Sequence, residues 1–194
     1  MQSTTSYSKL ASQLEVGHVY RRDSLLPFSK ALDRDLIILT KNGLLEKIGA
    51  GLYYRPEVSR WGTLPPKEDE VVREFLRDDQ FLIYSWNQYN LLWLGLTQIY
   101  NNLIVYNHKR HGKFELGKIN FDFRRPSRGF PDEISKEFLL VDLVNNLDEL
   151  AEDTSVLKSK IKENFVKFEQ EKIRTMVKKY GKIATQRLFK ELIS

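Results

Sequence analysis

A basic face with helical spacing is the clearest sign of chemistry in the sequence. Five residues follow the spacing i, i+3, i+4, i+7 and i+11 and therefore fall on one side of a helix: Lys30, Asp33, Arg34, Ile37 and Lys41. On such a face, Lys and Arg can contact phosphates, Arg can donate two hydrogen bonds to a guanine, and Ile can pack on a thymine methyl group. Asp33 would repel phosphate, as would Asp35 at the border of the opposite face. The pattern indicates a helix that enters the DNA major groove, and a merely solvated helix face is the alternative.

The residues around this face predict a helix followed by a hairpin. Ser29 suits an N-cap and Gly43 suits a left-handed C-terminal cap, so the helix is expected over residues 29–42. Short apolar or alternating runs over residues 44–55, interrupted by Gly49-Ala50-Gly51, indicate a tight hairpin. A basic helix face with a hairpin directly after it is typical of a winged helix-turn-helix, in which the helix lies in the major groove and the hairpin, or wing, touches the flanking backbone.

The preceding residues complete this arrangement. A first amphipathic helix is expected from Tyr7 to Leu14, with N-caps among Ser3 to Thr5, followed by a short strand at residues 18–20 that pairs with the wing. A brief second helix begins at Asp23 or Ser24. The sequence therefore predicts a winged helix-turn-helix DNA-binding domain over residues 1–60. Its predicted DNA-binding residues are Arg21, Arg22, Lys30, Arg34, Ile37, Lys41, Lys47 and Arg55.

A second domain is expected over residues 64–194, after a linker over residues 58–66 that contains Pro65-Pro66. Alternating and apolar runs predict four strands, at residues 81–84, 103–106, 113–116 and 119–123. Helix signals return at Pro131 and Glu133 and continue into a basic helical tail. The predicted fold class is α+β: an N-terminal winged helix-turn-helix followed by a mixed α/β domain with a helical C-terminal tail.

Composition limits the possible functions. The chain has 194 residues, a formal net charge of +5 and no cysteine. The charge permits contact with nucleic acid without requiring it. The lack of cysteine excludes disulfides, thiolate metal sites and cysteine nucleophiles. We find no run long enough to cross a bilayer and no signal peptide, so no membrane partner is expected. The expected location is cytoplasmic, and nucleoid-associated when the protein is bound to DNA.

Two residue pairs could carry other chemistry. His108 and His111 have an H-x-x-H spacing, but they lie in a Lys/Arg/Gly turn rather than on an apolar helix. Glu115 and Asp122 lie on neighbouring predicted strands, a geometry that holds divalent metals in some nucleases. The lysine usual in such nucleases is replaced by Arg124. A metal-dependent nucleic-acid-processing enzyme is therefore the less favoured alternative, and we expect no catalytic residues, no metal and no cofactor.

Four segments in this order resemble a known family. They are Gly51-Leu52-Tyr53-Tyr54-Arg55-Pro56, Leu64-Pro65-Pro66, Leu94-Gly95-Leu96-Thr97 and Phe121-Asp122-Phe123-Arg124-Arg125. Together they resemble the AbiEi-like antitoxins and transcriptional regulators of bacterial type IV toxin–antitoxin systems. The sequence departs from the family pattern after Thr97. The resemblance implies an N-terminal winged helix that binds operator DNA and represses its own operon. It also implies a C-terminal domain that counteracts a nucleotidyltransferase-like toxin encoded nearby, and it supplies no catalytic residues.

The expected function is thus that of an autorepressor and antitoxin in an abortive-infection system. The expected partners are double-stranded operator DNA and a nearby nucleotidyltransferase-like toxin, with a monomer or weak dimer pairing on inverted repeats. The basic loop with Arg124, Arg125 and Arg128 is a candidate surface for the toxin or for nucleic acid. A plain winged-helix regulator whose second domain dimerises or senses a ligand is the alternative.

Overall fold

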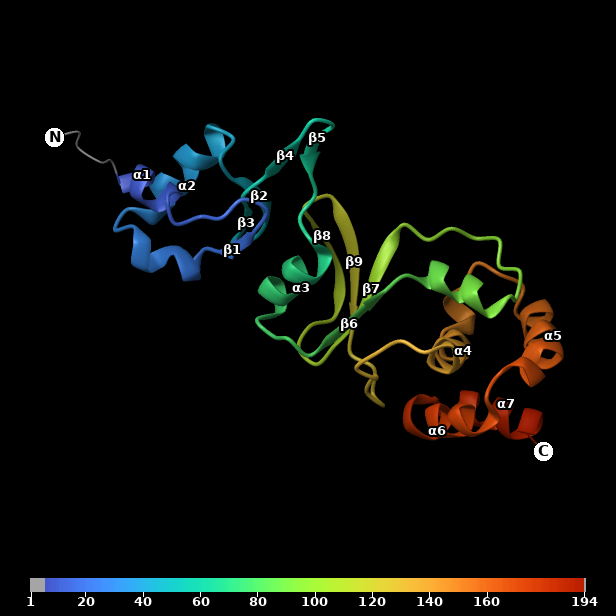
Figure 1. Cartoon of the computed structure of the whole chain (residues 1–194). Coiled ribbons are helices and arrows are strands. Elements are labelled where there is room, and N and C mark those ends of the chain that lie inside the picture. The colour runs from blue at the N-terminus through green and yellow to red at the C-terminus, as the bar shows by residue number, and fades with distance from the viewer. Residues whose placement is uncertain (1–5, 194) are drawn as a thin grey trace. The chain divides into compact units, whose positions relative to one another are not determined.

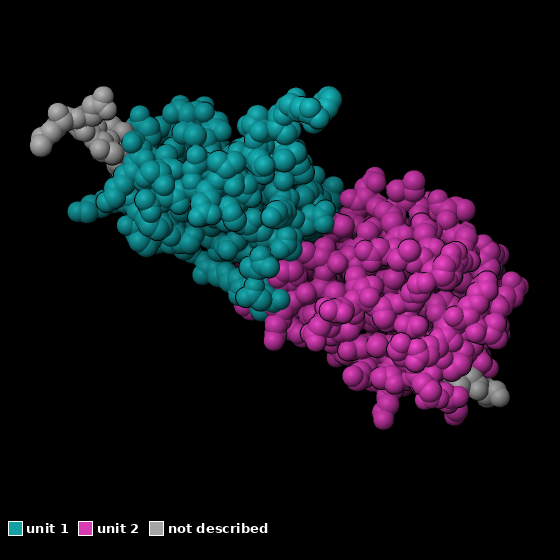
Figure 2. Space-filling model, in the orientation of Figure 1, with its two compact units in different colours: residues 1–79, 113–121 teal, residues 80–112, 122–194 magenta. Residues whose placement is uncertain are grey.

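The computed structural model describes residues 6–193 and shows a mixed α+β fold (Figure 1). The chain forms two compact units, the first from residues 1–79 and 113–121 and the second from residues 80–112 and 122–194 (Figure 2). The boundary that the sequence predicts, between residues 60 and 64, lies inside the first unit. Ser3 to Thr5, the predicted caps of the first helix, lie outside the described residues. Within residues 6–193, no helix is both long and apolar enough to cross a membrane.

The first unit alternates short helices and short strands. In chain order these are α1 (Ser6–Ala11), β1 (Val19–Arg21), the 3₁₀ helix η1 (Asp23–Phe28), α2 (Leu32–Lys41), β2 (Glu46–Gly49), β3 (Leu52–Tyr54), β4 (Glu57–Ser59), β5 (Gly62–Leu64) and α3 (Glu68–Leu76). Leucines from α1, η1, α2 and the segments that follow α1 and α2 form its helical core: Leu10, Leu14, Leu25, Leu32, Leu36, Leu39 and Leu45. Full burial of each such side chain stabilises the unit by about 1.5–3 kcal/mol.

The predicted pairing of the short strand with the hairpin is confirmed. Strands β1, β3 and β2 form an antiparallel sheet in that order, with Val19 opposite Tyr54 and Arg21 opposite Leu52. A bulge between Lys47 and Gly49 shifts the register of β2 against β3. The hairpin of this sheet therefore joins a four-residue strand, β2, to a three-residue strand, β3, and it follows α2 after a short connection.

The N-cap of helix α2 lies two residues later than the sequence predicts. Residue Ala31 occupies the N-cap position, and the Ser29 side chain is buried instead. The Ser29 hydroxyl donates to the Asp35 carboxylate (2.6 Å) and accepts from the backbone N–H of Ala31 (3.0 Å). The predicted end is confirmed, because Gly43 has a φ of +71° and its N–H donates to the carbonyl of Thr40.

The second unit contains a sheet and most of the helices. Its elements, together with the two strands β8 and β9 that the two units divide, are β6 (Phe81–Tyr84), η2 (Trp86–Leu92), β7 (Asn102–Asn107), β8 (Gly112–Leu116), β9 (Ile119–Arg124), α4 (Lys136–Asn145), η3 (Leu147–Glu149), α5 (Thr154–Asn164), η4 (Phe165–Lys167), α6 (Gln170–Tyr180) and α7 (Ile183–Ile193). These four strands have the order β6-β7-β9-β8, and all four were predicted. The helix expected from Pro131 begins instead at Lys136, where Ser135 accepts from the N–H of Phe138.

An ionisable side chain lies at the centre of the second unit. Asp142 on α4 is 1% exposed, and its carboxylate accepts from the hydroxyls of Tyr106 (2.6 Å), Tyr89 (2.7 Å) and Tyr84. The Asn146 amide donates to the same carboxylate at 3.3 Å. Burial raises the pKa of each of the three phenols, so they stay protonated and donate at neutral pH. Burial also raises the pKa of Asp142, against the opposing effect of these hydrogen bonds.

Candidate nucleic-acid interface

The predicted reading face of α2 is exposed. Three of its residues have exposed side chains: Arg34, Ile37 and Lys41. Lys30, which the sequence predicts on the same face, is also exposed but lies in the turn before the first residue of α2, so helical spacing does not place it there. The Arg34 side chain is 73% exposed and Ile37 is 56% exposed. The opposite face is buried in the leucine core of the first unit, which fixes the rotation of the helix about its axis. The three exposed side chains on α2 can therefore reach a ligand without any movement of the helix.

The first acid expected to repel phosphate has a cationic partner. The Arg22 guanidinium donates twice to the Asp33 carboxylate, from Nε to Oδ1 (2.7 Å) and from Nη2 to Oδ2 (2.8 Å). This hydrogen bonding, together with the positive charge of Arg22, lowers the pKa of Asp33 and raises the pKa of Arg22. Arg22 thus offsets the negative charge on the outer face of α2.

The second acid, Asp35, does not face solvent. It is 0% exposed and is held by the buried hydroxyl of Ser29. This pair joins the segment before α2 to the first turn of the helix. Asp35 therefore sets where the helix begins, and it adds no exposed carboxylate to the reading face.

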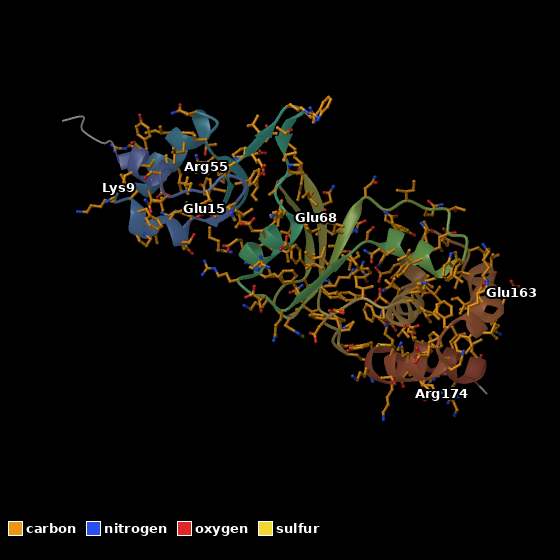
Figure 3. The ribbon with its side chains drawn as sticks, viewed as in Figure 1. Lys9, Glu15, Arg55, Glu68, Glu163 and Arg174 are labelled. Atoms are coloured by element: carbon orange, nitrogen blue, oxygen red, sulfur yellow. The ribbon has the colours of Figure 1, made fainter. Side chains whose placement is uncertain are left out.

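Two predicted phosphate contacts serve the fold instead. Arg21 donates to the backbone carbonyls of Glu74 and Phe75, at the C-terminal end of α3. Arg55 donates to the backbone carbonyls of Ala11 (3.1 Å) and Leu14, just after α1 (Figure 3). Carbonyls at helix ends have no partner within the helix and carry partial negative charge, so a guanidinium stabilises them. Helix phase and strand position could not identify this role, because both partners lie far away in the sequence.

The end of strand β2 in the β2–β3 hairpin packs against another segment of the first unit. The N–H of Gly117, in the turn after β8, donates to the carbonyl of Ile48 (2.9 Å). A Cβ added at Gly49 would lie 2.7 Å from a methyl group of Leu116, which is itself buried. Lys47 remains exposed on β2. The hairpin predicted to be the wing is thus short and is packed at the end of its first strand, whereas Ala50 in its turn is exposed.

The predicted linker is an ordered hairpin that the sequence analysis missed. Strands β4 and β5 pair with Val58 opposite Thr63, and their turn carries Trp61, which is 84% exposed. The Arg60 guanidinium lies 5.0 Å from the centre of the Trp61 ring. Two signals were present: β-branched residues at matching positions, Val58 and Thr63, and a Ser-Arg-Trp-Gly turn between them.

The three arginines of the basic loop have different environments. Arg124 is bound by Asp122 (2.7 Å) and Glu149 (2.8 Å) and lies over the Trp86 ring. Burial alone would lower its pKa, but hydrogen bonds to the two acids outweigh burial and raise the pKa of Arg124. Arg125 is exposed. Arg128 donates to the carbonyls of Lys178 and Lys179 at the C-terminal end of α6: the distance from Nη2 to the Lys178 oxygen is 2.6 Å. Only Arg125 of the three extends freely from this loop.

The alternative metal site does not assemble in the described part of the chain. The Asp122 carboxylate accepts from Arg124, which is a poor setting for a metal ligand because the guanidinium already occupies its oxygen. No group of three or more His, Cys, Asp or Glu side chains among residues 6–193 is placed to hold a metal ion. The His108 ring stacks on Phe130 with centroids 4.9 Å apart.

Comparison with known proteins gives one match. Neither the curated proteins nor the solved structures compared with the chain gave a match. One family model matches residues 17–184, which is most of the chain and includes both the α2 face and the Asp142 cluster. The protein therefore belongs to DUF6088, a family of unknown function.

Proposed function

We propose that this protein is a DNA-binding transcriptional autorepressor and the antitoxin of a type IV toxin–antitoxin system. In this proposal the first unit is a winged helix-turn-helix that binds double-stranded operator DNA, and α2 is its recognition helix. The second unit counteracts a nucleotidyltransferase-like toxin encoded nearby. The protein acts in the cytoplasm as a monomer or as a weak dimer on inverted repeats.

The single observation that carries the DNA-binding part is the exposed face of α2. The elements around it follow the order α1-β1-η1-α2-β2-β3 with sheet order β1-β3-β2, which supports a winged-helix assignment. The face offers Lys41 for a phosphate, Arg34 for a guanine and Ile37 for a thymine methyl group, and the exposed Lys30 just before the helix is a further candidate for a phosphate. The pairing of Asp33 with Arg22 supports the same assignment, because it reduces repulsion between this face and phosphate.

The structure narrows the set of proposed DNA contacts. Lys30, Arg34, Ile37, Lys41 and Lys47 are retained because their side chains are exposed. Arg21 and Arg55 are assigned to the fold, and Arg22 to the orientation and charge of Asp33. The antitoxin part rests on the resemblance of four sequence segments to AbiEi-like antitoxins.

Arg34→Ala tests the reading role of α2. The full chain would first select a duplex from a randomised pool, and the affinity of wild type and variant would be measured on that duplex and on a scrambled one. We expect Arg34→Ala to weaken binding to the selected duplex by about 1–3 kcal/mol and to affect the scrambled duplex much less. Lys9→Ala, an exposed cation on α1 (Figure 3), is the matched control and should leave the selectivity unchanged. Equal losses on both duplexes would show that Arg34 contacts phosphate only.

A growth assay tests the antitoxin role. The neighbouring gene would be expressed alone, with the wild-type chain and with the Arg34→Ala/Ile37→Ala double variant. Growth arrest by the neighbour and rescue by both chains would support an antitoxin whose action is separable from DNA reading. If only the wild-type chain rescues growth, the antitoxin effect depends on repression through DNA binding. If expression of the neighbouring gene does not arrest growth, the antitoxin role is wrong and the protein is a plain regulator.

A further inference from the structure

The first unit has two hairpins, and they differ in how closely they pack against the rest of the unit. The β2–β3 hairpin is packed at the end of β2, where Gly49 lies against Leu116 and the carbonyl of Ile48 accepts from the N–H of Gly117. The β4–β5 hairpin, which follows β3 after two residues, stands out from the surface of its unit (Figures 1 and 2). Its Val58 and Trp61 are 76% and 84% exposed. The free hairpin is therefore the one that the sequence predicts to be a linker.

This free hairpin is held in a defined conformation. The Ser59 hydroxyl accepts from the N–H of Trp61 (3.1 Å) and donates to the carbonyl of Gly62 (2.8 Å), which orders the turn. At the base, the buried Tyr54 of β3 donates its hydroxyl hydrogen to the carbonyl of Leu64 (3.0 Å). Strand β3 of the β1-β3-β2 sheet thus anchors the base of the hairpin. Because the hairpin is already ordered, binding costs little further conformational entropy there.

The hairpin and the recognition helix border one depression. Thr40 and Gly43, at the C-terminal end of α2, line it together with Val58 and Leu64 of the hairpin. Its volume is about 750 Å³. All of these residues belong to the first unit. A ligand that contacts the exposed face of α2 and continues past its C-terminal end therefore meets the hairpin next.

The charges beside the depression suit a polyanion. Lys47 and Lys118 line it with one acid, Glu46, and Lys118 is exposed at the turn after β8. Arg60 adds a cation at the hairpin tip, directly on the Trp61 ring. No carboxylate in the described part of the chain pairs with Arg60. A guanidinium stacked on an exposed indole can contact a phosphate and present an aromatic face to sugars and bases at the same time.

We propose that the β4–β5 hairpin is the wing of this protein: Arg60 contacts a DNA phosphate and Trp61 packs on the adjacent deoxyriboses and bases, beside the segment read by α2. Lys47 and Lys118 hold phosphates between the two contacts. This inference rests on the proposed DNA binding of α2 and assigns a second, sequence-independent contact to it. The occupant is duplex DNA, and a second copy of the chain is the competing occupant.

The test measures binding of the full chain to the selected and scrambled duplexes. We expect Trp61→Ala to weaken binding to both duplexes equally, by about tenfold, because stacking and packing on an aromatic ring do not read sequence. Trp61→Phe should retain most of the affinity. Arg60→Ala should lower the slope of log affinity against log salt by about one, as expected for one lost phosphate contact.

The chain supplies a matched control in its second unit. Trp93 is 61% exposed and carries the Lys136 ammonium 4.3 Å from its ring centre, so it repeats the cation–indole pair on residues of the second unit. Trp93→Ala should leave DNA affinity unchanged. Circular dichroism of each variant checks the fold, which the removal of exposed side chains should not alter.

Three outcomes separate the hypotheses. Selective loss with Arg34→Ala but unchanged affinity with Trp61→Ala would overturn the wing assignment and leave the proposed function intact. No binding of the wild-type chain to either duplex would overturn both. If Trp61→Ala converts a dimer to a monomer in sedimentation and its loss of affinity follows from that change alone, the hairpin is a self-association element and the inference is wrong.

Discussion

Each unit contains an arginine stacked on a tryptophan, and the two pairs have opposite surroundings. In the second unit, Arg124 is 17% exposed, lies over the buried Trp86 and is bound by two carboxylates. In the first unit, Arg60 lies over the exposed Trp61 at a hairpin tip. The same cation–indole contact therefore joins a network of hydrogen-bonded charges in one place and is presented to solvent in the other. Burial and acidic partners, and not the residue types, decide which of the two is structural.

The largest expected effect concerns the enclosed polar groups of the second unit. Asp142→Ala leaves the hydroxyls of Tyr84, Tyr89 and Tyr106 without their common acceptor, so we expect a loss of about 3–5 kcal/mol in the free energy of unfolding. Asp142→Asn keeps the volume and one acceptor and should cost on the order of 1–2 kcal/mol. Urea unfolding would be followed by Trp86 fluorescence, with Trp61 and Trp93 replaced by Phe.

The control for this measurement is the exposed Asp132. Asp132→Ala should change the free energy of unfolding by less than about 0.5 kcal/mol. A loss below about 1 kcal/mol for Asp142→Ala would mean that the phenols find other acceptors, water among them. The enclosed polar groups around Asp142 would then contribute no more to the free energy of unfolding than exposed ones do.

An intermediate effect is expected when each of the two stacked arginines is replaced and the losses in the free energy of unfolding are compared. Arg124→Met leaves Asp122, whose side chain is 8% exposed, without its guanidinium, and we expect a cost of about 2–4 kcal/mol. Arg60→Met removes a cation from an exposed ring and should cost less than about 0.5 kcal/mol. Both would be measured by the same unfolding experiment. Similar costs for the two variants would contradict the distinction drawn between the pairs.

The features that the sequence predicted depend on local patterns. The helix face, its end at Gly43, the pairing of residues 18–20 with the hairpin and four later strands follow from periodicity and turn residues, which act over a few positions. Arg55 contacts Leu14, which lies 41 residues away in the sequence, and Arg124 contacts Glu149, which lies 25 residues away. No local pattern could reveal such distant partners. The β4–β5 hairpin was missed for a different reason: its strands have three residues each, and the two prolines beyond it favoured a linker.

The smallest expected effect concerns the exposed pair Arg22–Asp33. Hydrogen bonding from Arg22 lowers the pKa of Asp33 in the folded protein, so the pair stabilises the fold above the ordinary carboxyl value of about 3.8 and this contribution is lost as the pH falls through the folded value. We expect Arg22→Gln to return the pKa of Asp33 to near its ordinary value, as measured by a carboxyl-carbon NMR titration. The difference in stability between wild type and variant should be small at neutral pH and absent below both pKa values, because the pair is exposed to solvent.

This titration also bears on the reading face of α2. A lowered pKa for Asp33 in the wild type means that the guanidinium stays beside the carboxylate in solution, so an approaching phosphate meets a paired charge. If Asp33 titrates at its ordinary value in the wild type, the pair is not maintained, and α2 presents a bare carboxylate one residue before Arg34. Binding of a polyanion by this face would then have to overcome that repulsion, and the free hairpin with Arg60 and Trp61 would become the stronger of the two candidate DNA contacts.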